Sequence, residues 1–382
     1  MVSFLRDLIC PACRRTFADR PARTFCQECG RTLVARYDLE QVKEKMTRDR
    51  LRARPPDLRR FEELLPIREA RSQVSLGEME TPVLRVNDPE LAPRGELWVK
   101  CDGSLPTGTF KARGMAIAVS KAKELGLQSL FVPTAGNAGA ALAAYAARGS
   151  MKALVFMPQG APESAQRQVE AYGGELRTVP GHIGDAARVG REEATRRRAF
   201  DVSTLREPWR AEGKKTMGLE IFWQMGREGM PSAIVYPTGG GTGLVGMHRA
   251  FTQLRELGWL DQVPRLYAAQ SEGCAPVVEA LRRGAEQVTP VKDPRTEAAG
   301  LRVPSPFSSE DILGAVRATR GGGVAVKETA IAPAARRFMA AHGISVARET
   351  GTALAGLRQL REEGAIDPQE RVLVYNTGLW VG

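Results

Sequence analysis

Lys111 is the residue of this sequence whose position most strongly suggests chemistry. It stands in LPTGTFKARGM, residues 105–115, where a proline, a glycine and two threonines lead into a run of helical character. The first turn of a helix disfavours a positive charge, so an amine there is partly freed to act as a nucleophile and a base. A structural lysine, or one that contacts an anion, is the ordinary alternative for Lys111 taken alone.

Two other loops have compositions that suit anions, and each lies between an apolar run and a helical run. The first is YPTGGGTGLVG, residues 236–246, whose backbone N–H groups can wrap a phosphate at the start of a helix. The candidate contacts in this glycine cup are Gly239, Gly240, Gly241, Thr242 and Gly243. A plain tight turn is the alternative interpretation.

The second loop is PTAGNAGAA, residues 133–141, a shorter cradle with the size for a carboxylate. Its candidate contacts are Thr134, Ala135, Gly136 and Ala138, together with the side-chain amide of Asn137, which is otherwise a common loop and cap residue. The three histidines of the chain are far apart in sequence. A lysine nucleophile with two anion loops and no obvious histidine base indicates an enzyme that uses pyridoxal phosphate (PLP) as its electron sink.

Four of the six cysteines form a separate pattern near the start of the chain. Cys10 and Cys13 lie in CPAC, and Cys26 and Cys29 lie in CQECG. Two such pairs can direct four thiolates at one ion, which suits tetrahedral zinc, whereas two disulfides are the alternative. Because four thiolates leave no open position on the metal, we expect structural rather than catalytic Zn²⁺.

The elements that must position these residues are short apolar runs that alternate with amphipathic helical runs. Most of the apolar runs are continuous, as in strands that are buried on both faces of a parallel sheet. The expected strands are residues 97–100, 130–134, 153–158, 233–238, 266–270 and 372–377. We therefore expect an α/β fold, whose ligands bind where strands end and helices begin.

The overall composition excludes several classes of protein. A length of 382 residues, with 43% hydrophobic and 26% charged residues, is typical of a globular protein of two domains. No apolar run has the length of a membrane span and MVSFLRDLIC lacks the apolar region of a secretory signal, so we expect a cytoplasmic protein without a membrane partner. The net charge of +11 would suit nucleic acid, but the arginines are interleaved with acids and the aromatic residues are scattered. A zinc-ribbon protein that binds nucleic acid would need neither Lys111 nor the two loops, so we expect no nucleic-acid partner.

Six segments together resemble the threonine synthases, within the tryptophan synthase β-like (fold type II) PLP enzymes. They are PTGTFKARGM, PTAGNAGAALAAYAA, EGKKTMG, PTGGGTGL, SEGCAP and VLVYNTG, and the resemblance covers roughly residues 77–378. It implies two α/β domains with parallel sheets flanked by helices, and it implies a homodimer. The expected parts are a zinc-ribbon-like module at residues 1–36, a helical arm with the first part of the large PLP domain at 37–111, a smaller α/β domain at 112–207, and the remainder of the large domain at 208–382.

The resemblance also implies roles for individual residues. Lys111 would bind PLP as a Schiff base, Asn137 would bind its 3′-hydroxyl, and residues 239–243 would hold its phosphate. Thr377, in YNTG, would face the pyridine nitrogen, where a neutral hydroxyl favours elimination and replacement over transamination. The substrate would be O-phosphohomoserine, which water converts to threonine and phosphate. The candidates for binding the substrate's own phosphate are Arg113, Lys214 and Lys215, for which plain surface charge is the alternative.

Two departures from the family pattern bear on the substrate. Ala112 stands at the position where the family motif FKDRG has aspartate. The resulting FKARG is also similar to the corresponding motif of the threonine and serine dehydratases. The usual NTGSGLK is replaced by NTGLWVG, so that Leu379 and Trp380 stand where small residues are expected. The alternatives are therefore a threonine or serine dehydratase, or a cysteate synthase-like enzyme that acts on O-phosphoserine.

Overall fold

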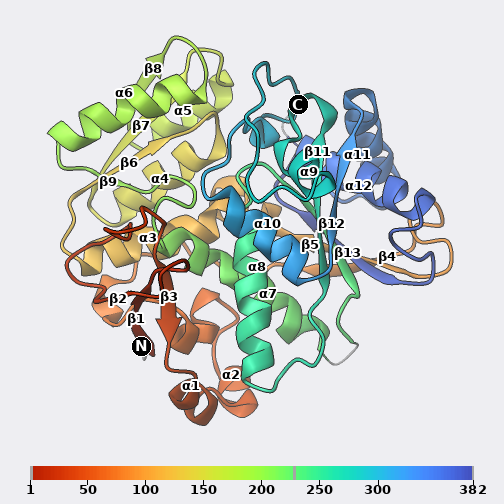
Figure 1. Cartoon of the computed structure of the whole chain (residues 1–382), viewed down its shortest axis with the longest axis horizontal. Helices are drawn as coiled ribbons and strands as arrows, with labels where there is room; N and C mark the ends of the chain where they lie inside the picture. The colour runs from red at the N-terminus through yellow and green to blue at the C-terminus, as the bar shows by residue number, and fades with distance from the viewer. Residues whose placement is uncertain (1–2, 227–228, 381–382) are drawn as a thin grey trace. The chain divides into compact units, whose positions relative to one another are not determined.

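The computed structural model describes residues 3–226 and 229–380, and the chain divides into two compact units (Figure 1). The first unit combines Met1–Glu80 with Lys111–Thr216, and the second combines Thr81–Phe110 with Met217–Gly382. Within the described residues, no helix is long and apolar enough to cross a membrane.

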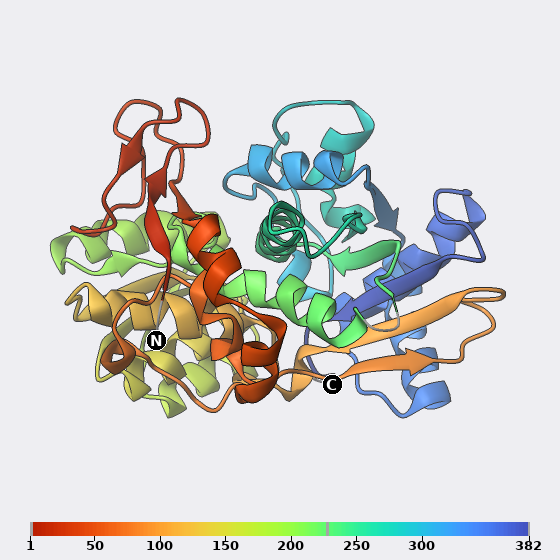
Figure 2. The ribbon, with the colours of Figure 1, turned by 90° about the horizontal axis from the view of Figure 1, so that it is seen from below.

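The first unit starts with a small antiparallel sheet, which we call the cysteine ribbon (residues 3–37; red in Figure 2). Its strands, in the order β2-β1-β3, are β1 (Leu5–Ile9), β2 (Thr16–Phe17) and β3 (Val34–Tyr37). A series of short helices follows, as the charged, proline-broken sequence predicts: α1 (Leu39–Lys45), α2 (Arg48–Ala53), η1 (Leu58–Leu64) and η2 (Ala70–Ser72). Helix α2 ends just before Pro55 because a residue that precedes proline is pushed out of the helical region.

The larger sheet of the first unit is parallel and has the order β8-β7-β6-β9. Its strands are β6 (Ser129–Pro133), β7 (Lys152–Pro158), β8 (Glu175–Val179) and β9 (Phe200–Asp201). The helices around it are α3 (Lys111–Glu124), α4 (Asn137–Arg148), α5 (Glu163–Ala171), α6 (Ile183–Arg196) and the first part of α7 (Trp209–Met225). Small residues let α4 approach the sheet closely, since a Cβ at Gly139 would lie 2.8 Å from Val155 Cγ1.

The second unit is built on a six-stranded sheet of order β12-β11-β10-β13-β5-β4. Its strands are β4 (Val83–Val86), β5 (Glu96–Cys101), β10 (Ala233–Pro237), β11 (Arg265–Ser271), β12 (Gly322–Val326) and β13 (Arg371–Asn376). All neighbours run parallel except the edge strand β4, which is antiparallel to β5. The chain moves outward from β10 to β12 and then returns to β13 on the other side of β10.

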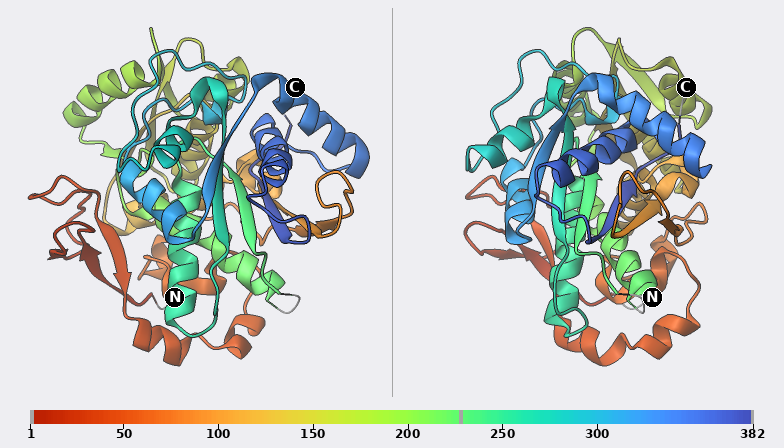
Figure 3. Two further views of the ribbon diagram at one scale, coloured as in Figure 1. Left: turned by 45° about the vertical axis from the view of Figure 1, so that its right-hand side comes forward. Right: turned by 90° about the vertical axis from the view of Figure 1, so that its right-hand side faces the viewer.

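This reversal of direction distributes the helices of the second unit over both faces of its sheet, because parallel crossovers are right-handed. Helices α8 (Thr242–Glu256), α9 (Pro276–Arg282) and α10 (Ser309–Ala318) form one layer. Helices α11 (Glu328–His342) and α12 (Arg348–Glu362), in blue in Figure 3, pack together as the other layer. The main core of the unit lies under α11 and α12, where Phe338 and Leu357 meet strand residues such as Val235.

The six strands predicted from continuous apolar runs are confirmed as β5, β6, β7, β10, β11 and β13. The sequence did not reveal β8, whose exposed Glu175 and Thr178 mark it as an edge strand, or β12, which begins with two glycines. Both lack the apolar run that identifies a buried strand, and pairing with a neighbour makes them strands.

Candidate functional site

Three adjacent strands of the second unit deliver three of the predicted loops to one edge of the sheet. Strand β13 lies between β10 and β5, in parallel register with both. The glycine cup leaves the carboxyl end of β10, Thr377 leaves that of β13, and the segment that leads to Lys111 leaves that of β5. The strand order reverses between β10 and β13, and such a switch point is where open parallel sheets bind ligands.

The segment that leads to Lys111 is fixed to the loop after β13 by its backbone. The Phe110 N–H donates to the Thr377 carbonyl at 3.0 Å, and the Leu379 N–H donates to the Gly108 carbonyl at 3.3 Å. Helix α3 begins directly afterwards at Lys111, which confirms the helix start that the sequence predicted, and Lys111 is half-buried. The residue that precedes Lys111 in the chain is therefore hydrogen-bonded to the Thr377 loop.

The glycine cup ends in a helix start that fits an anion. Gly241, with φ of 66°, is the N-cap residue of α8 and has no side chain that could cap the first N–H groups of this helix. Such uncapped N–H groups and the helix dipole together favour a phosphate. A Cβ at Gly239 would lie 2.3 Å from the Gly300 carbonyl oxygen, and one at Gly243 would lie 2.3 Å from the ring of Tyr236. The residues present thus suit the PLP phosphate, and the glycines are required by close packing.

A buried aromatic cluster joins the three loops of the second unit from behind. The Tyr236 ring lies edge-on to Phe110 at 6.2 Å and to Tyr375 at 5.6 Å, measured between ring centres. The Tyr375 hydroxyl donates to Asp102 at 2.8 Å, and Asp102 also accepts a hydrogen bond from Thr81 at 2.8 Å. Burial, and then the charge of Asp102, raise the pKa of Tyr236 well above its usual value, so the Tyr236 hydroxyl stays protonated.

Sequence reasoning missed this cluster, although one signal was present. Asp102 is an acid that directly follows the buried strand β5 and is itself fully buried. A carboxylate in that position needs donors, but the sequence does not say that they are Tyr375 of strand β13 and Thr81, which lies just before strand β4.

The first unit carries the carboxylate cradle at the carboxyl end of β6. The Gly136 N–H donates to Thr134 Oγ1 at 3.1 Å, and helix α4 then begins at Asn137 without a side-chain cap. A Cβ at Gly136 would meet nothing within 4 Å, so the backbone faces open space. Asn137 is exposed, Ala135 is half-buried and Ala138 is buried. An uncapped helix start beside open space has room and donors for a carboxylate.

Two of the three predicted phosphate-binding cations lie close together in the first unit. Helices α3 and α7 cross at a pair of glycines, where a Cβ at Gly213 would lie 2.2 Å from the Arg113 carbonyl oxygen. At the same crossing, a Cβ at Gly114 would lie 3.3 Å from Lys214 Cε. Arg113 is fully buried and donates to Thr216 Oγ1 at 3.0 Å, and Lys214 is also buried. Two buried cations at one helix crossing suit a multiply charged anion.

Lys215, the third predicted cation, is held by the protein itself. Its Nζ pairs with Glu212 Oε2 at 2.7 Å and lies 3.9 Å from the centre of the Tyr37 ring. The Tyr37 hydroxyl donates to the same Glu212 carboxylate at 2.8 Å. The structure therefore places Lys215 in a buried group with Glu212 and Tyr37.

The four N-terminal cysteines come together as one cluster that could hold a metal ion. The sulfur atoms of Cys10, Cys13, Cys26 and Cys29 all lie within 4.8 Å of one another. The Cys10 carbonyl accepts from the Arg14 N–H and the Cys26 carbonyl accepts from the Gly30 N–H, so the two cysteine turns have the same form. Burial raises the pKa of the Cys10 thiol, but hydrogen bonds from the backbone of Cys13 and Ala12 and from the side chains of Cys13 and Cys26 together lower it to about 7. These residues fit a tetrahedral thiolate-bound ion.

This chain is similar in sequence and fold to several known proteins. Residues 74–378 match the family model of pyridoxal-phosphate dependent enzymes. A threonine synthase of Methanocaldococcus jannaschii is 33% identical over 372 residues, which are 97% of this chain and 91% of the relative. A threonine synthase of Methanosarcina acetivorans is 30% identical over 375 residues, which are 97% of this chain and 91% of the relative. The solved structure of maize serine racemase shares the fold, with a TM-score of 0.70 at 20% identity over 79% of this chain and 89% of that one.

Proposed function

Because this chain belongs to the family of pyridoxal-phosphate dependent enzymes, we propose that it is a threonine synthase, which converts O-phosphohomoserine and water to threonine and phosphate. Its similarity to two threonine synthases over 97% of its length supports this reaction. The observation that carries the proposal is the common edge of β10, β13 and β5, which gathers the glycine cup, Thr377 and the lead into Lys111.

We propose that the cofactor is held mainly by these three loops. The first N–H groups of α8 and the backbone of residues 239–243 would bind the PLP phosphate, with Thr242 adding a hydroxyl. Asn137 would bind the 3′-hydroxyl, and the Thr377 hydroxyl would face the ring nitrogen. When bound, PLP supplies the electron sink that makes protons on the substrate carbons acidic.

The chain's own residues would then bind the substrate and move its protons. The cradle at residues 134–138 would hold the substrate carboxylate, and Arg113 with Lys214 would hold its phosphate. The Lys111 amine would accept the Cα proton. A second proton leaves Cβ, and phosphate leaves Cγ with its bridging oxygen. Cγ then takes up one proton to become the methyl group, water adds its hydroxyl to Cβ, and Cα regains a proton. The second proton of water stays with the released phosphate, so the net reaction exchanges phosphate for water. We propose that Lys215 acts in structure, since Glu212 and Tyr37 already bind it.

The four cysteines would bind structural Zn²⁺, because four clustered sulfurs leave no coordination position for a substrate. Thiolates that hold a metal need a reducing compartment, which supports a cytoplasmic location. A homodimer, which the resemblance predicts, would be tested by light scattering on the purified protein.

The reaction is tested by incubating purified holoenzyme with O-phosphohomoserine and measuring phosphate and threonine together. Equal amounts of both products, lost in Lys111→Ala, would support the proposal. Formation of 2-oxobutyrate from threonine as the sole activity would indicate a dehydratase. Turnover of O-phosphoserine alone would indicate a β-replacement enzyme, and the buried Ala112, where the family usually has aspartate, would then be the first residue to examine.

A further inference from the structure

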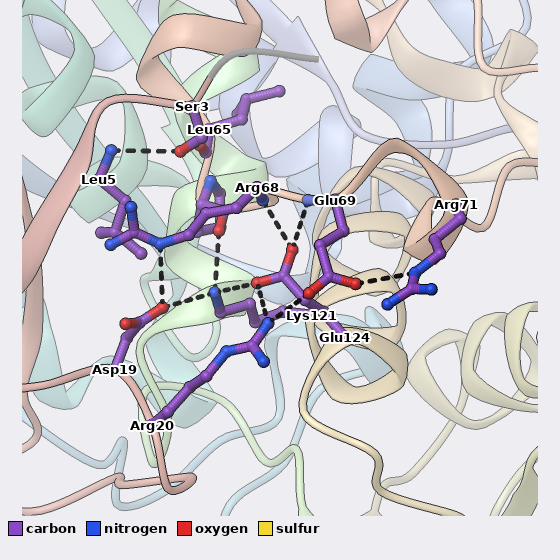
Figure 4. A network of polar contacts seen from close by, with 11 residues as sticks. Ser3, Leu5, Asp19, Arg20, Leu65, Arg68, Glu69, Arg71, Lys121 and Glu124 are labelled. Carbon is purple, nitrogen blue, oxygen red and sulfur yellow. Dashed lines mark hydrogen bonds and ion pairs between the residues drawn. The ribbon is translucent and has the colours of Figure 1, made fainter.

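Asp19, in the loop between the two cysteine pairs, contacts Lys121 of helix α3 (Figure 4). The Asp19 carboxylate accepts from Lys121 Nζ at 2.7 Å, and Lys121 has no exposed side-chain surface. Lys121 also donates to Glu124 at 2.5 Å and to the Pro66 carbonyl at 3.0 Å. A buried ammonium needs such partners, because removal of one leaves charge in a medium that solvates it poorly.

The last strand of the ribbon, β3, contacts helix α7 through Tyr37. Tyr37 ends β3, where it pairs with Leu5 across the ribbon sheet. Its hydroxyl donates to Glu212 at 2.8 Å, and its ring covers the Lys215 ammonium at 3.9 Å. The fixed Tyr37 thereby sets the position of the first turns of α7, next to Gly213 and Lys214.

The contacts of Asp19 and Tyr37 are made to α3 and α7, the two helices that carry the buried cations. Arg113 is on α3 and Lys214 is on α7, and the close approach of the two helices at Gly114 and Gly213 brings these residues to the same crossing. We propose that Asp19 and Tyr37 are positioning residues, which use the metal-closed ribbon to hold this crossing in the geometry that binds the substrate phosphate. The claim about substrate rests on the proposed function, whereas the claim about the crossing does not.

A metal bound by the four cysteines would close the ribbon by joining its two cysteine turns. Strand β2 has only two residues, so we expect strand pairing to hold this part of the ribbon only weakly once the ion is removed. Loss of the ion should therefore release Asp19 and Tyr37 together. The glycine cup and Thr377 belong to the second unit, so we expect cofactor binding to persist.

The first test compares Asp19→Asn and Tyr37→Phe holoenzymes with Asp7→Asn. Asp7 is the matched control, because it lies in the same ribbon but pairs with Arg36 of the ribbon itself. Loss of one hydrogen bond to a charged group corresponds to about a tenfold change in an equilibrium constant. We expect KM for O-phosphohomoserine to rise about tenfold in both variants, with kcat and the visible absorption of bound PLP unchanged. An unchanged KM in both variants would overturn the proposal.

The second test needs no turnover and so separates this proposal from the proposed function. Trp209 is fully buried, and Lys121 Nζ lies 5.1 Å from the centre of its ring. Treatment of the holoenzyme with a chelator should shift tryptophan emission, and this shift should be absent in Trp209→Phe. Calorimetric binding of inorganic phosphate to the same samples should weaken about tenfold after chelation. If emission and phosphate binding both survive chelation, the ribbon does not position the crossing, whatever the enzyme's substrate proves to be.

Discussion

Gly243 offers the sharpest test of how the glycine cup is built, because an added methyl group there has no space. A Cβ at Gly243 would lie 2.3 Å from Cζ and Oη of Tyr236, whereas ordinary van der Waals contact begins near 3.4 Å. Tyr236 would have to retreat by roughly 1 Å, yet it is fully buried between Phe110 and Tyr375. We therefore expect Gly243→Ala to lower the free energy of unfolding by about 1–3 kcal/mol, and the thermal midpoint by roughly 2–10 °C.

The same displacement should weaken cofactor binding. A shift of Tyr236 moves Phe110, which is the neighbour of Lys111, together with the first turn of α8. A misplacement of this size costs on the order of tenfold to hundredfold in function, so we expect a loss of that order in PLP affinity, measured by visible absorption as apoenzyme is titrated with PLP.

Gly314→Ala is the matched control for this substitution. Gly314 lies within α10, where a Cβ would meet nothing within 4 Å, so the same change should be neutral or stabilise the helix by up to about 1 kcal/mol. If Gly243→Ala unfolds at the midpoint of Gly314→Ala and binds PLP like the wild type, the account of the cup is wrong.

Three further predictions concern charge and backbone. Arg14 has φ of 63°, which costs a residue with a side chain about 1 kcal/mol, so Arg14→Gly should make metal release to a competing chelator slower. Burial raises the pKa of Asp88, but the hydrogen bond and charge of Arg337 outweigh it and hold the pKa below its usual value. The paired Asp88 carboxylate therefore stabilises the fold above the ordinary carboxyl pKa, and this stabilisation is lost as pH falls below it. We expect Asp88→Asn to lower the free energy of unfolding in urea by about 1–3 kcal/mol at pH 7 and by little near pH 2. Lys215→Met leaves the buried Glu212 without its cation and should cost about 3–5 kcal/mol in the same measurement, whereas an unchanged midpoint would show that the pair is dispensable.

Local sequence patterns predicted the parts of the site that local structure determines. Continuous apolar runs identified β10 and β13 because a strand buried on both faces has no polar alternation. Glycines and threonines between a strand and a helix marked the cup and the start of α3, and Lys111 is indeed the first residue of that helix. These features depend on a few neighbouring residues, and the order of those residues is visible in the sequence.

What escaped prediction depends on residues that are distant in the chain. The contact of Lys215 with Tyr37 could not be predicted, because Tyr37 stands far earlier in the sequence, on the ribbon. Asp102 gains its donor from Tyr375, which the sheet order alone brings to its side. Pairing of this kind follows from topology, and one sequence carries no local signal for it.

The most direct test of the proposed reaction is turnover of O-phosphohomoserine in ¹⁸O-labelled water. If the enzyme expels phosphate from Cγ and adds water at Cβ, the label appears in the hydroxyl of threonine, and the released phosphate carries none. Lys111→Ala should form neither product. Labelled phosphate with homoserine as the product would mean hydrolysis at phosphorus and would contradict the account.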